Sequence, residues 1–277
     1  MFSSDEWTGR TGDVWADEWR RTDRSFDGLD DRLNAAILAA APSTGSAVDL
    51  GCGAGGTSIA LATARPDLDV TGLDISPALI AVARHRGAGI GNLQFDVTDT
   101  SALDPAIDAD LLMSRHGVMF FADPIASFTA IRAAARPGAT LVFSCFRDRS
   151  ANPWAMLSDD LVGAPPPSPP GYAPGPFGFA DRAFVADLLA RSGWENADAT
   201  AVDYRYVAGQ GDDPVADAAD FFTRIGPVAR TIAEQPAGRR ADLVERLKAL
   251  LAPHVTGDTV VFPAAAWIWT TTNGEAA

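Results

Sequence analysis

Short apolar runs alternate with segments of helical character through the middle of the chain. Helices are predicted between these runs, because Ser76 and Asp123 are capping residues that each precede a proline, and a further helix opens at Thr57. Strands that alternate with helices require crossover connections, which favour a parallel sheet with helices on both faces. The five runs of strand length are residues 48–50, 70–73, 93–95, 110–114 and 140–144.

The segments on either side of this alternation have a different character. Before it, amphipathic patterns predict helices over 13–24 and 29–41, with Trp15 among the aromatic residues along one side of the first. After it, residues 164–176 contain seven prolines, which favours an extended lid or crossover, with a plain linker as the alternative. A helix is then expected over 181–191 and two more within 215–252, and strands over 196–207 and 259–271 are expected to form an antiparallel, hairpin-like edge.

Composition and charge exclude several classes of partner. The chain has 277 residues, 47% of them hydrophobic, which is ample for a large buried core. Its net charge of −14 would repel phosphate backbones and anionic membrane surfaces, so neither nucleic acid nor a membrane is expected as a partner. The first residues lack the basic and apolar regions of a signal peptide, and a cytoplasmic location is expected. Cys52 and Cys145 are expected to be small buried residues, and no metal site is expected.

A glycine-rich turn follows the first strand. The glycines at 51, 53 and 56 are expected to adopt positive φ and to let backbone N–H groups and the next helix's N-terminus face a ligand. Asp74 ends the second strand, where its carboxylate can accept hydrogen bonds from both hydroxyls of a ribose. This pattern fits an adenosine-containing cofactor, and it also satisfies the dinucleotide fingerprint.

Further carboxylates at strand ends narrow the choice of cofactor. Asp49 lies two residues before the first glycine, where it can organise a cationic amine; nicotinamide sites usually keep that position apolar. Asp96 ends the third strand, at a height where it can meet an adenine amino group. The fourth strand ends beside the cofactor and continues into an apolar turn over 117–121.

These four strand ends, in this order and spacing, resemble those of class I S-adenosylmethionine-dependent methyltransferases, in particular a bacterial small-molecule subgroup. The runs that carry this second resemblance include Trp7-Thr8-Gly9, the segment 114–124, Asn152-Pro153-Trp154 and Pro174-Gly175-Pro176-Phe177. The resemblance implies S-adenosyl-L-methionine as cofactor and S-adenosyl-L-homocysteine as product. It also implies which residues bind the cofactor: Gly51 and Gly53 at its methionine portion, Asp74 and Ile75 at its ribose and adenine, Asp96 and Val97 at the adenine edge, and in addition Trp15, Asp49, Cys52, Ser114 and Arg115.

The fold expected from pattern and resemblance is α/β: a doubly wound, seven-stranded Rossmann-like sheet whose last strand is antiparallel. Residues 1–44 are expected to form an N-terminal helical cap and 45–146 the cofactor-binding core. Residues 147–180 are expected to form the Pro-rich lid or crossover, and 181–277 the rest of the sheet, with a helical substrate-pocket insertion at about 209–256.

The expected reaction is methyl transfer to a small molecule by in-line displacement, with O-methylation favoured. This reaction depends mainly on alignment and needs a base only when the acceptor carries a proton. His116 follows the fourth strand, so we expect it to act as general base or to orient the acceptor; the alternative is a histidine that only contacts the pocket or cofactor. An NAD(P)-dependent oxidoreductase and a catalytically silent cofactor-binding protein also stay open.

Aromatic residues outside the core motifs suggest how the site is completed. Trp15 is expected to fold over the methionine end of the cofactor, or else to attach its helix to the sheet. A cluster that includes Trp154, Phe177 and Phe222 favours an apolar or aromatic acceptor, although these rings also suit a core of the insertion. The expected partner is therefore a small-molecule acceptor, and a homodimer that shares the aromatic lid stays open.

Overall fold

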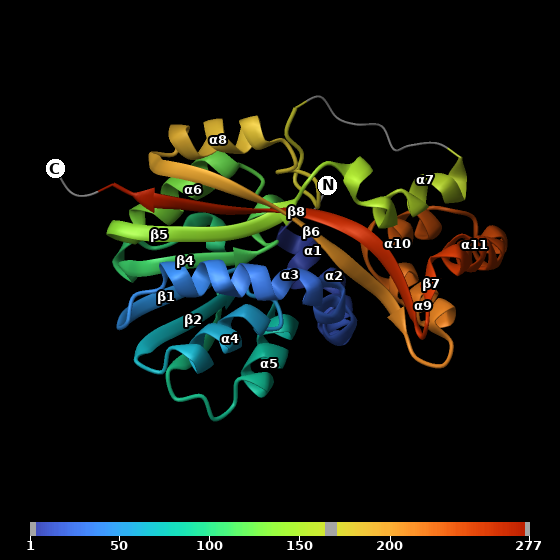
Figure 1. Ribbon diagram of the computed structural model, residues 1–277, viewed down its shortest axis with the longest axis horizontal. Helices are drawn as coiled ribbons and strands as arrows, with labels where there is room; N and C mark the ends of the chain where they lie inside the picture. The colour runs from blue at the N-terminus through green and yellow to red at the C-terminus, as the bar shows by residue number, and fades with distance from the viewer. Residues whose placement is uncertain (1–3, 164–170, 275–277) are drawn as a thin grey trace.

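The computed structural model describes residues 4–163 and 171–274, and its centre is one mixed sheet (Figure 1). The strands follow the order β3-β2-β1-β4-β5-β8-β6, with the short β7 paired to β8. The described strands are β1 Gly45–Leu50, β2 Leu68–Asp74, β3 Leu93–Val97, β4 Ala109–Arg115, β5 Ala135–Phe146, β6 Trp194–Gln210, β7 Val255–Thr256 and β8 Thr259–Asn273.

Strands β1 to β5 are parallel, and β8 runs antiparallel between β5 and β6. The carboxyl ends of the parallel strands therefore meet at one edge, where Asp74 of β2 is level with Val97 of β3. The expected doubly wound α/β sheet with an antiparallel last strand is confirmed. The described residues form eight strands instead of the expected seven, because β7 adds two residues beside β8.

Helices cover both faces of the sheet: α3, α4 and α5 lie along one face, and α6 and α8 along the other (Figure 1). Apolar residues from both layers join the strands in one continuous core. The described α-helices are α1 Ser4–Thr8, α2 Arg10–Asp17, α3 Trp19–Ala40, α4 Gly56–Ala64, α5 Pro77–Arg86, α6 Pro124–Ala133, α7 Leu157–Val162, α8 Arg182–Arg191, α9 Pro214–Arg224, α10 Gly226–Ala233 and α11 Ala237–Leu251.

The capping residues identified in the sequence lie at the starts of helices in the structure. Ser76 accepts a hydrogen bond from Leu79 N–H at the start of α5, and Asp123 accepts one from Ala126 N–H at the start of α6. Asp181 caps α8 in the same way. Each cap satisfies a backbone donor that the first helical turn leaves unpaired.

The expected boundary between the two N-terminal helices is wrong. The break falls at Glu18, between α2 and α3, and α3 runs on without interruption through Gly28. A Cβ atom at Gly28 would lie 3.2 Å from Arg205 O on β6. This glycine therefore allows α3 to pack closely on the sheet and does not end a helix.

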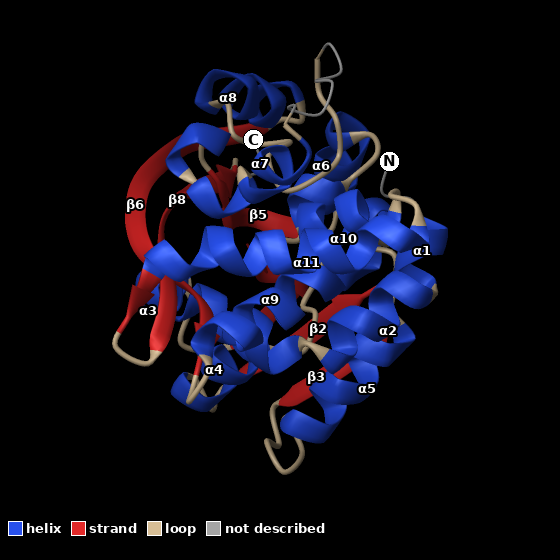
Figure 2. Ribbon diagram, turned by 90° about the vertical axis from the view of Figure 1, so that its right-hand side faces the viewer, coloured by secondary structure: helices blue, strands red, loops and turns tan. Residues whose placement is uncertain are grey.

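The segment 215–252 contains three helices where two were expected. Gly226, with φ of 76°, turns the chain between α9 and α10, and Pro236 precedes α11. Seen from the carboxyl edge of the sheet, α9, α10 and α11 lie in front of the strands (Figure 2). No helix within residues 4–163 and 171–274 is long and apolar enough to cross a membrane.

The Pro-rich run at 164–176 falls partly outside the described residues, which resume at Gly171. From there the chain passes close to the turn after β4: the Tyr172 hydroxyl donates to Phe121 O at 2.6 Å, and Gly175 N–H donates to Met119 O at 3.1 Å. The described part of this run therefore borders the carboxyl edge of the sheet.

Candidate active site

The glycine turn after β1 has the conformation that requires glycine. Gly51, Gly53 and Gly55 have φ of 65°, 55° and 80°. A Cβ atom at Gly51 would lie 3.2 Å from Gly117 Cα, whereas one at Gly53 would meet nothing within 4 Å. The turn therefore packs against the loop after β4 at Gly51 and is open at Gly53. The prediction of positive φ is wrong at Gly56, which begins α4; Gly55 takes that conformation.

Asp74 lies beside this turn at the end of β2. Gly53 N–H donates to its Oδ2 at 2.9 Å and Ser76 N–H donates to its Oδ1 at 2.8 Å. The two bonds fix the plane of the carboxylate and leave each oxygen with lone pairs for further donors. Burial raises the pKa of Asp74 above its ordinary value, against the effect of these backbone hydrogen bonds. Ile75, the next residue, is half-buried.

Asp49 is almost fully buried on β1, directly before the turn. The Ser58 hydroxyl donates to its Oδ2 at 2.6 Å, and its Oδ1 has no hydrogen-bond partner among the described residues. Burial raises the pKa of Asp49 to about 6, against the bond from Ser58. A buried carboxylate oxygen without a partner is costly for the folded protein, and a cationic ligand group would relieve that cost.

The end of β3 supplies a more open surface. Val97 is 48% exposed, which makes it one of three large exposed apolar side chains among the described residues. Asp96 is also exposed and its Oδ1 accepts from Arg84 at 3.1 Å. Asp74 is paired with Val97 across β2 and β3. A carboxylate that can accept hydrogen bonds from hydroxyl groups therefore lies at the same level of the sheet as an apolar surface.

Three other expected site residues direct their side chains elsewhere. Cys52 packs in a small cluster with residues of α5 and β3, and burial raises the pKa of its thiol. The Ser114 hydroxyl donates to Leu50 O at 2.7 Å and accepts from Gly117 N–H at 3.2 Å, which ties the ends of β1 and β4 together. Arg115 donates to Asp30 at 2.7 Å and also pairs with Asp23. These side chains have partners within the protein, and Arg115 also borders the glycine turn, with its Nη2 3.7 Å from where a Cβ atom of Gly56 would stand.

The N-terminal helices cover the glycine turn. Ala16 of α2 packs with Ala54 of the turn and Leu79 of α5, and Trp15 lies against this cluster. A Cβ atom at Gly12 would lie 2.3 Å from Ser76 Oγ, so α2 and α5 are in close contact. Trp15 is thus brought next to the turn.

A charged cluster fastens the same region. Arg86 donates to Ala54 O at 2.7 Å and to Asp23 at 2.8 Å, and its guanidinium lies 3.9 Å from the ring centre of Trp19. Sequence reasoning missed Asp23 and Arg86, because their partners lie on elements far apart in the chain. The only available signal for Arg86 was its place among the basic residues in the last turn of the helix that Ser76 caps.

His116 lies in the turn after β4, next to the contact between Gly117 and Gly51. Its φ of 59° is unusual for a residue with a side chain. Its Nδ1 lies 2.8 Å from Ser144 Oγ, and its ring packs 4.2 Å from that of Phe146 and 4.8 Å from that of Phe26. Nε2 has no partner among the described residues. Burial, helped by the charge of Arg115, lowers the pKa of His116 to about 3, so the imidazole is neutral at pH 7.

Comparison with known proteins identifies the part of the chain that carries these features. Residues 43–164 match a family model described as a methyltransferase domain. These residues form a class I methyltransferase domain. They include the glycine turn, the ends of β1 to β4 and His116, so the family resemblance inferred from the sequence is confirmed for this domain.

Curated relatives match up to about half of the chain. The chain is 30% identical over 137 residues to trans-aconitate 2-methyltransferase of Methylobacterium nodulans, which covers 49% of this chain and 52% of that protein. It is 36% identical over 120 residues to the ubiquinone biosynthesis O-methyltransferase of Cereibacter sphaeroides, covering 42% and 46%. The chain thus spans about half the length of these relatives.

Solved structures share the fold over most of the chain. Phosphoethanolamine N-methyltransferase 2 of Haemonchus contortus, in complex with S-adenosyl-L-methionine, matches with a TM-score of 0.56 and 15% identity, covering 99% of this chain and 61% of that one. The YcgJ protein of Bacillus subtilis matches with a TM-score of 0.55 and 14% identity, covering 88% and 98%. Both share the fold of this chain beyond residue 164.

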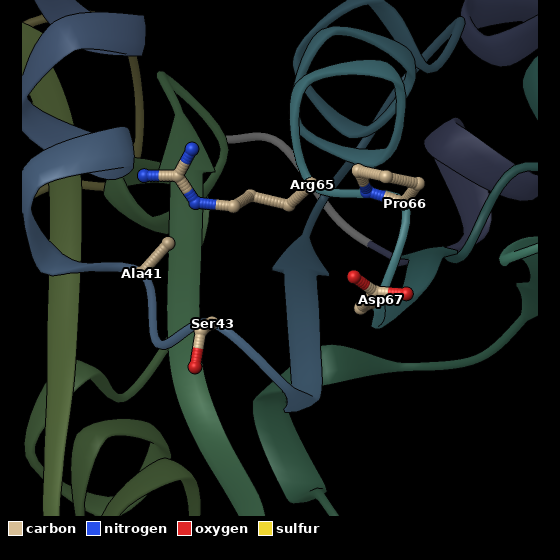
Figure 3. A pocket seen from close by; sticks show the side chains of 5 residues that line it. All are labelled: Ala41, Ser43, Arg65, Pro66 and Asp67. Atoms are coloured by element: carbon tan, nitrogen blue, oxygen red, sulfur yellow. The ribbon is translucent and has the colours of Figure 1, made fainter.

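A surface hollow of about 360 Å³ lies away from the methyltransferase site (Figure 3). Its lining residues precede β1 and β2, so it lies at the amino edge of the sheet; they are Ala41, Ser43, Arg65, Pro66 and Asp67. Arg65 is held there by donation to Leu38 O at 3.0 Å. The hollow therefore takes no part in the arrangement at the carboxyl edge.

Proposed function

We propose that this protein transfers the methyl group of S-adenosyl-L-methionine to a small organic acceptor. When bound, this cofactor supplies a methyl carbon on a sulfonium, which an acceptor atom attacks in line. The observation that carries the proposal is the set of groups beside the glycine turn: Gly53 is open where a Cβ would stand, and Asp49 Oδ1 is buried without a partner. Both suit a ligand with an amino acid portion and a ribose.

Each residue of the site has a task in this proposal. Asp49 accepts from the cofactor's ammonium group, directly or through water, which compensates its buried charge. Asp74, fixed by Gly53 and Ser76, accepts from the ribose hydroxyls. Val97 supplies an apolar surface for the adenine ring, and Asp96 lies at the edge of that ring. Trp15 and α2 exclude water from the methionine end.

A small acceptor is supported by the relatives, whose names describe methyltransferases for trans-aconitate and for ubiquinone biosynthesis. We assign the methyl acceptor to the side of the site where His116 lies, next to aromatic side chains of β5 and of the chain that follows β5. Trp154 stacks on Tyr206 at 4.9 Å and packs on Phe146 at 5.1 Å. This environment favours an apolar or aromatic acceptor, methylated on oxygen, with helices α9 to α11 completing the pocket.

The nicotinamide alternative fits the sheet less well. Dinucleotide-binding sheets of the doubly wound type continue past the fifth strand with a parallel sixth strand. Here β8 enters antiparallel between β5 and β6. Nicotinamide sites also lack a use for the buried carboxylate of Asp49.

Calorimetry with S-adenosylhomocysteine and NAD tests the cofactor. We expect S-adenosylhomocysteine to bind and NAD to give no heat of binding. Asp74→Asn should weaken the binding of S-adenosylhomocysteine by about tenfold or more, because hydrogen bonds to a charged group are lost. Asp198→Asn removes an exposed carboxylate of β6 and is the matched control. Binding of NAD in place of S-adenosylhomocysteine would refute the proposal.

Catalysis is tested separately with methyl-labelled S-adenosylmethionine and a panel of small acids, phenols and alcohols. Transfer of label to one of them is the expected result. Tight binding of S-adenosylhomocysteine without transfer to any acceptor, including those in a cell extract, would instead indicate a silent cofactor-binding protein.

A further inference from the structure

Two ring N–H groups at the carboxyl edge of the sheet are buried next to the same aromatic ring. His116 and Trp154 are each 6% exposed, and they pack against Phe146 at ring distances of 4.2 and 5.1 Å. Among the described residues, His116 Nε2 and Trp154 Nε1 have no hydrogen-bond partner. Buried polar groups in folded proteins are normally paired, so these two atoms point to a ligand or ordered water.

The contact with Ser144 decides which nitrogen of His116 carries the proton. Within residues 4–163 and 171–274, the only hydrogen-bond contact of the Ser144 hydroxyl is with His116 Nδ1, at 2.8 Å. The hydroxyl proton is satisfied only if Ser144 donates to Nδ1, because no second acceptor is near. The neutral imidazole then carries its single proton on Nε2. The free nitrogen of His116 is therefore a hydrogen-bond donor, as is Trp154 Nε1.

A donor at this position changes what His116 can do. A general base must present a lone pair to the proton that it removes, and Nε2–H presents none. Among the described residues, the His116 ring is hydrogen-bonded to Ser144 and packs against Phe26 and Phe146, and none of these side chains is a base. An alcohol or a phenol would need such a base, whereas a carboxylate is already ionised at neutral pH and accepts hydrogen bonds from two donors.

We propose that the acceptor is a planar, unsaturated or aromatic carboxylate and that the product is its methyl ester. This inference rests on the proposed methyl transfer and names its substrate class. His116 Nε2–H and Trp154 Nε1–H donate to the carboxylate and orient it, and the Phe146 and Phe177 rings contact its apolar part. One carboxylate oxygen forms the bond to the methyl carbon while the carbon–sulfur bond breaks. The bonding electron pair stays on sulfur, and no proton is released.

A further feature of the site supports a carboxylate that carries an apolar part. Phe177 packs 5.7 Å from Phe146 and 6.0 Å from Trp154, so the three rings form apolar walls next to the donors. Ser144 acts as a positioning residue, because it sets the proton of His116 without facing the acceptor itself.

The test compares acceptors that share a skeleton. Trans-cinnamate, benzoate and fumarate are offered with labelled S-adenosylmethionine beside cinnamyl alcohol and phenol. We expect label in base-labile methyl esters and none in ethers. We also expect kcat to be independent of pH from 6 to 9, since the carboxylate is ionised throughout. Transfer to the alcohol or phenol only, or to no carboxylate, overturns the inference.

Variants separate the donor role from a structural one. Trp154→Phe removes the N–H donor together with part of the ring, as Trp269→Phe does at the control position, and should raise KM for the carboxylate at least tenfold. Ser144→Ala removes the hydroxyl that fixes the proton of His116 on Nε2. We expect KM to rise and kcat to become dependent on pH. Trp269→Phe is the matched control: Trp269 is buried and pairs with Phe143, which lies on the opposite face of β5 from Ser144. Its kinetics should be those of the unaltered protein, and equal effects of Trp154→Phe and Trp269→Phe would contradict the donor role.

Calorimetry distinguishes failure of this inference from failure of the proposed function. Protein that binds S-adenosylhomocysteine and methylates an alcohol retains the proposed function and refutes the carboxylate. Protein that binds no S-adenosylhomocysteine refutes both. Variants are compared only where their affinity for S-adenosylhomocysteine equals that of the unaltered protein, which shows that they are folded.

Discussion

Replacement of Asp49 by asparagine separates the stability of the fold from cofactor binding. The carboxylate is buried, and its Oδ1 has no partner among the described residues. Burial raises its pKa from 3.8 to about 6. A carboxyl group whose pKa is raised by folding destabilises the folded state once it ionises, so the unliganded protein carries a cost at Asp49 that asparagine lacks.

The size of this cost follows from the pKa values. A rise from 3.8 to about 6 corresponds to about 3 kcal/mol at pH values well above 6. The cost is absent below pH 3.8 and grows as the pH rises toward 6. Between pH 5 and pH 7.5 the linkage relation gives a loss of roughly 1 to 2 kcal/mol for the carboxyl form relative to the amide form.

Chemical denaturation without cofactor, at pH 5 and pH 7.5, measures this difference. We expect the free energy of unfolding of Asp49→Asn, relative to that of the unaltered protein, to be higher by roughly 1 to 2 kcal/mol at pH 7.5 than at pH 5. The same variant should bind S-adenosylhomocysteine more weakly, and the fall in affinity of the unaltered protein below pH 6 should disappear. Asp198→Asn is the control. A stability difference that stays constant between the two pH values would refute the reasoning.

Three further substitutions test separate parts of the fold. Gly53→Ala places a methyl group in the open side of the turn at φ of 55°; we expect a loss of about 1 kcal/mol in stability and at least tenfold weaker S-adenosylhomocysteine binding by calorimetry. Gly12→Ala would bring its Cβ to 2.3 Å from Ser76 Oγ, so it should push α2 off α5 and weaken cofactor binding with little change in the core. Asn152→Ala removes the bonds to Ala265 N–H at 3.0 Å and O at 3.2 Å, and should cost about 2–3 kcal/mol in denaturant unfolding.

Controls for these substitutions lie elsewhere in the chain. Gly238→Ala adds a methyl group to α11 where nothing lies within 4 Å, and it should leave cofactor affinity unchanged. Unaltered affinity in Gly12→Ala would show that the contact of α2 with α5 does not matter for binding. Wild-type stability in Asn152→Ala would show that the backbone groups of Ala265 find other partners.

The sheet and its glycine turn could be predicted from the sequence because both rest on local signals. Strand length, the caps at Ser76 and Asp123 and the order of strands and helices each follow from neighbouring residues. The position of Asp49 and Asp74 at the carboxyl edge followed from the same pattern.

The errors arose where distant contacts decide the structure. Gly28 was expected near a helix end, but β6 packs against it and the helix continues. Arg115 pairs with Asp23 and Asp30 of α3, and these partners were likewise not indicated by any spacing in the sequence. The partner of His116 is Ser144 on the next strand, which no spacing in the sequence could indicate.

The insertion of β8 between β5 and β6 has a consequence for how the protein is made. Residues 259–273 leave the ribosome after every other strand, yet they fill an interior place in the sheet. Until then β5 has an open edge and the seventeen residues of β6 have no neighbouring strand. The nascent chain therefore exposes two unpaired strands until residues 259–273 have been made, and protection by a chaperone matters most in that interval.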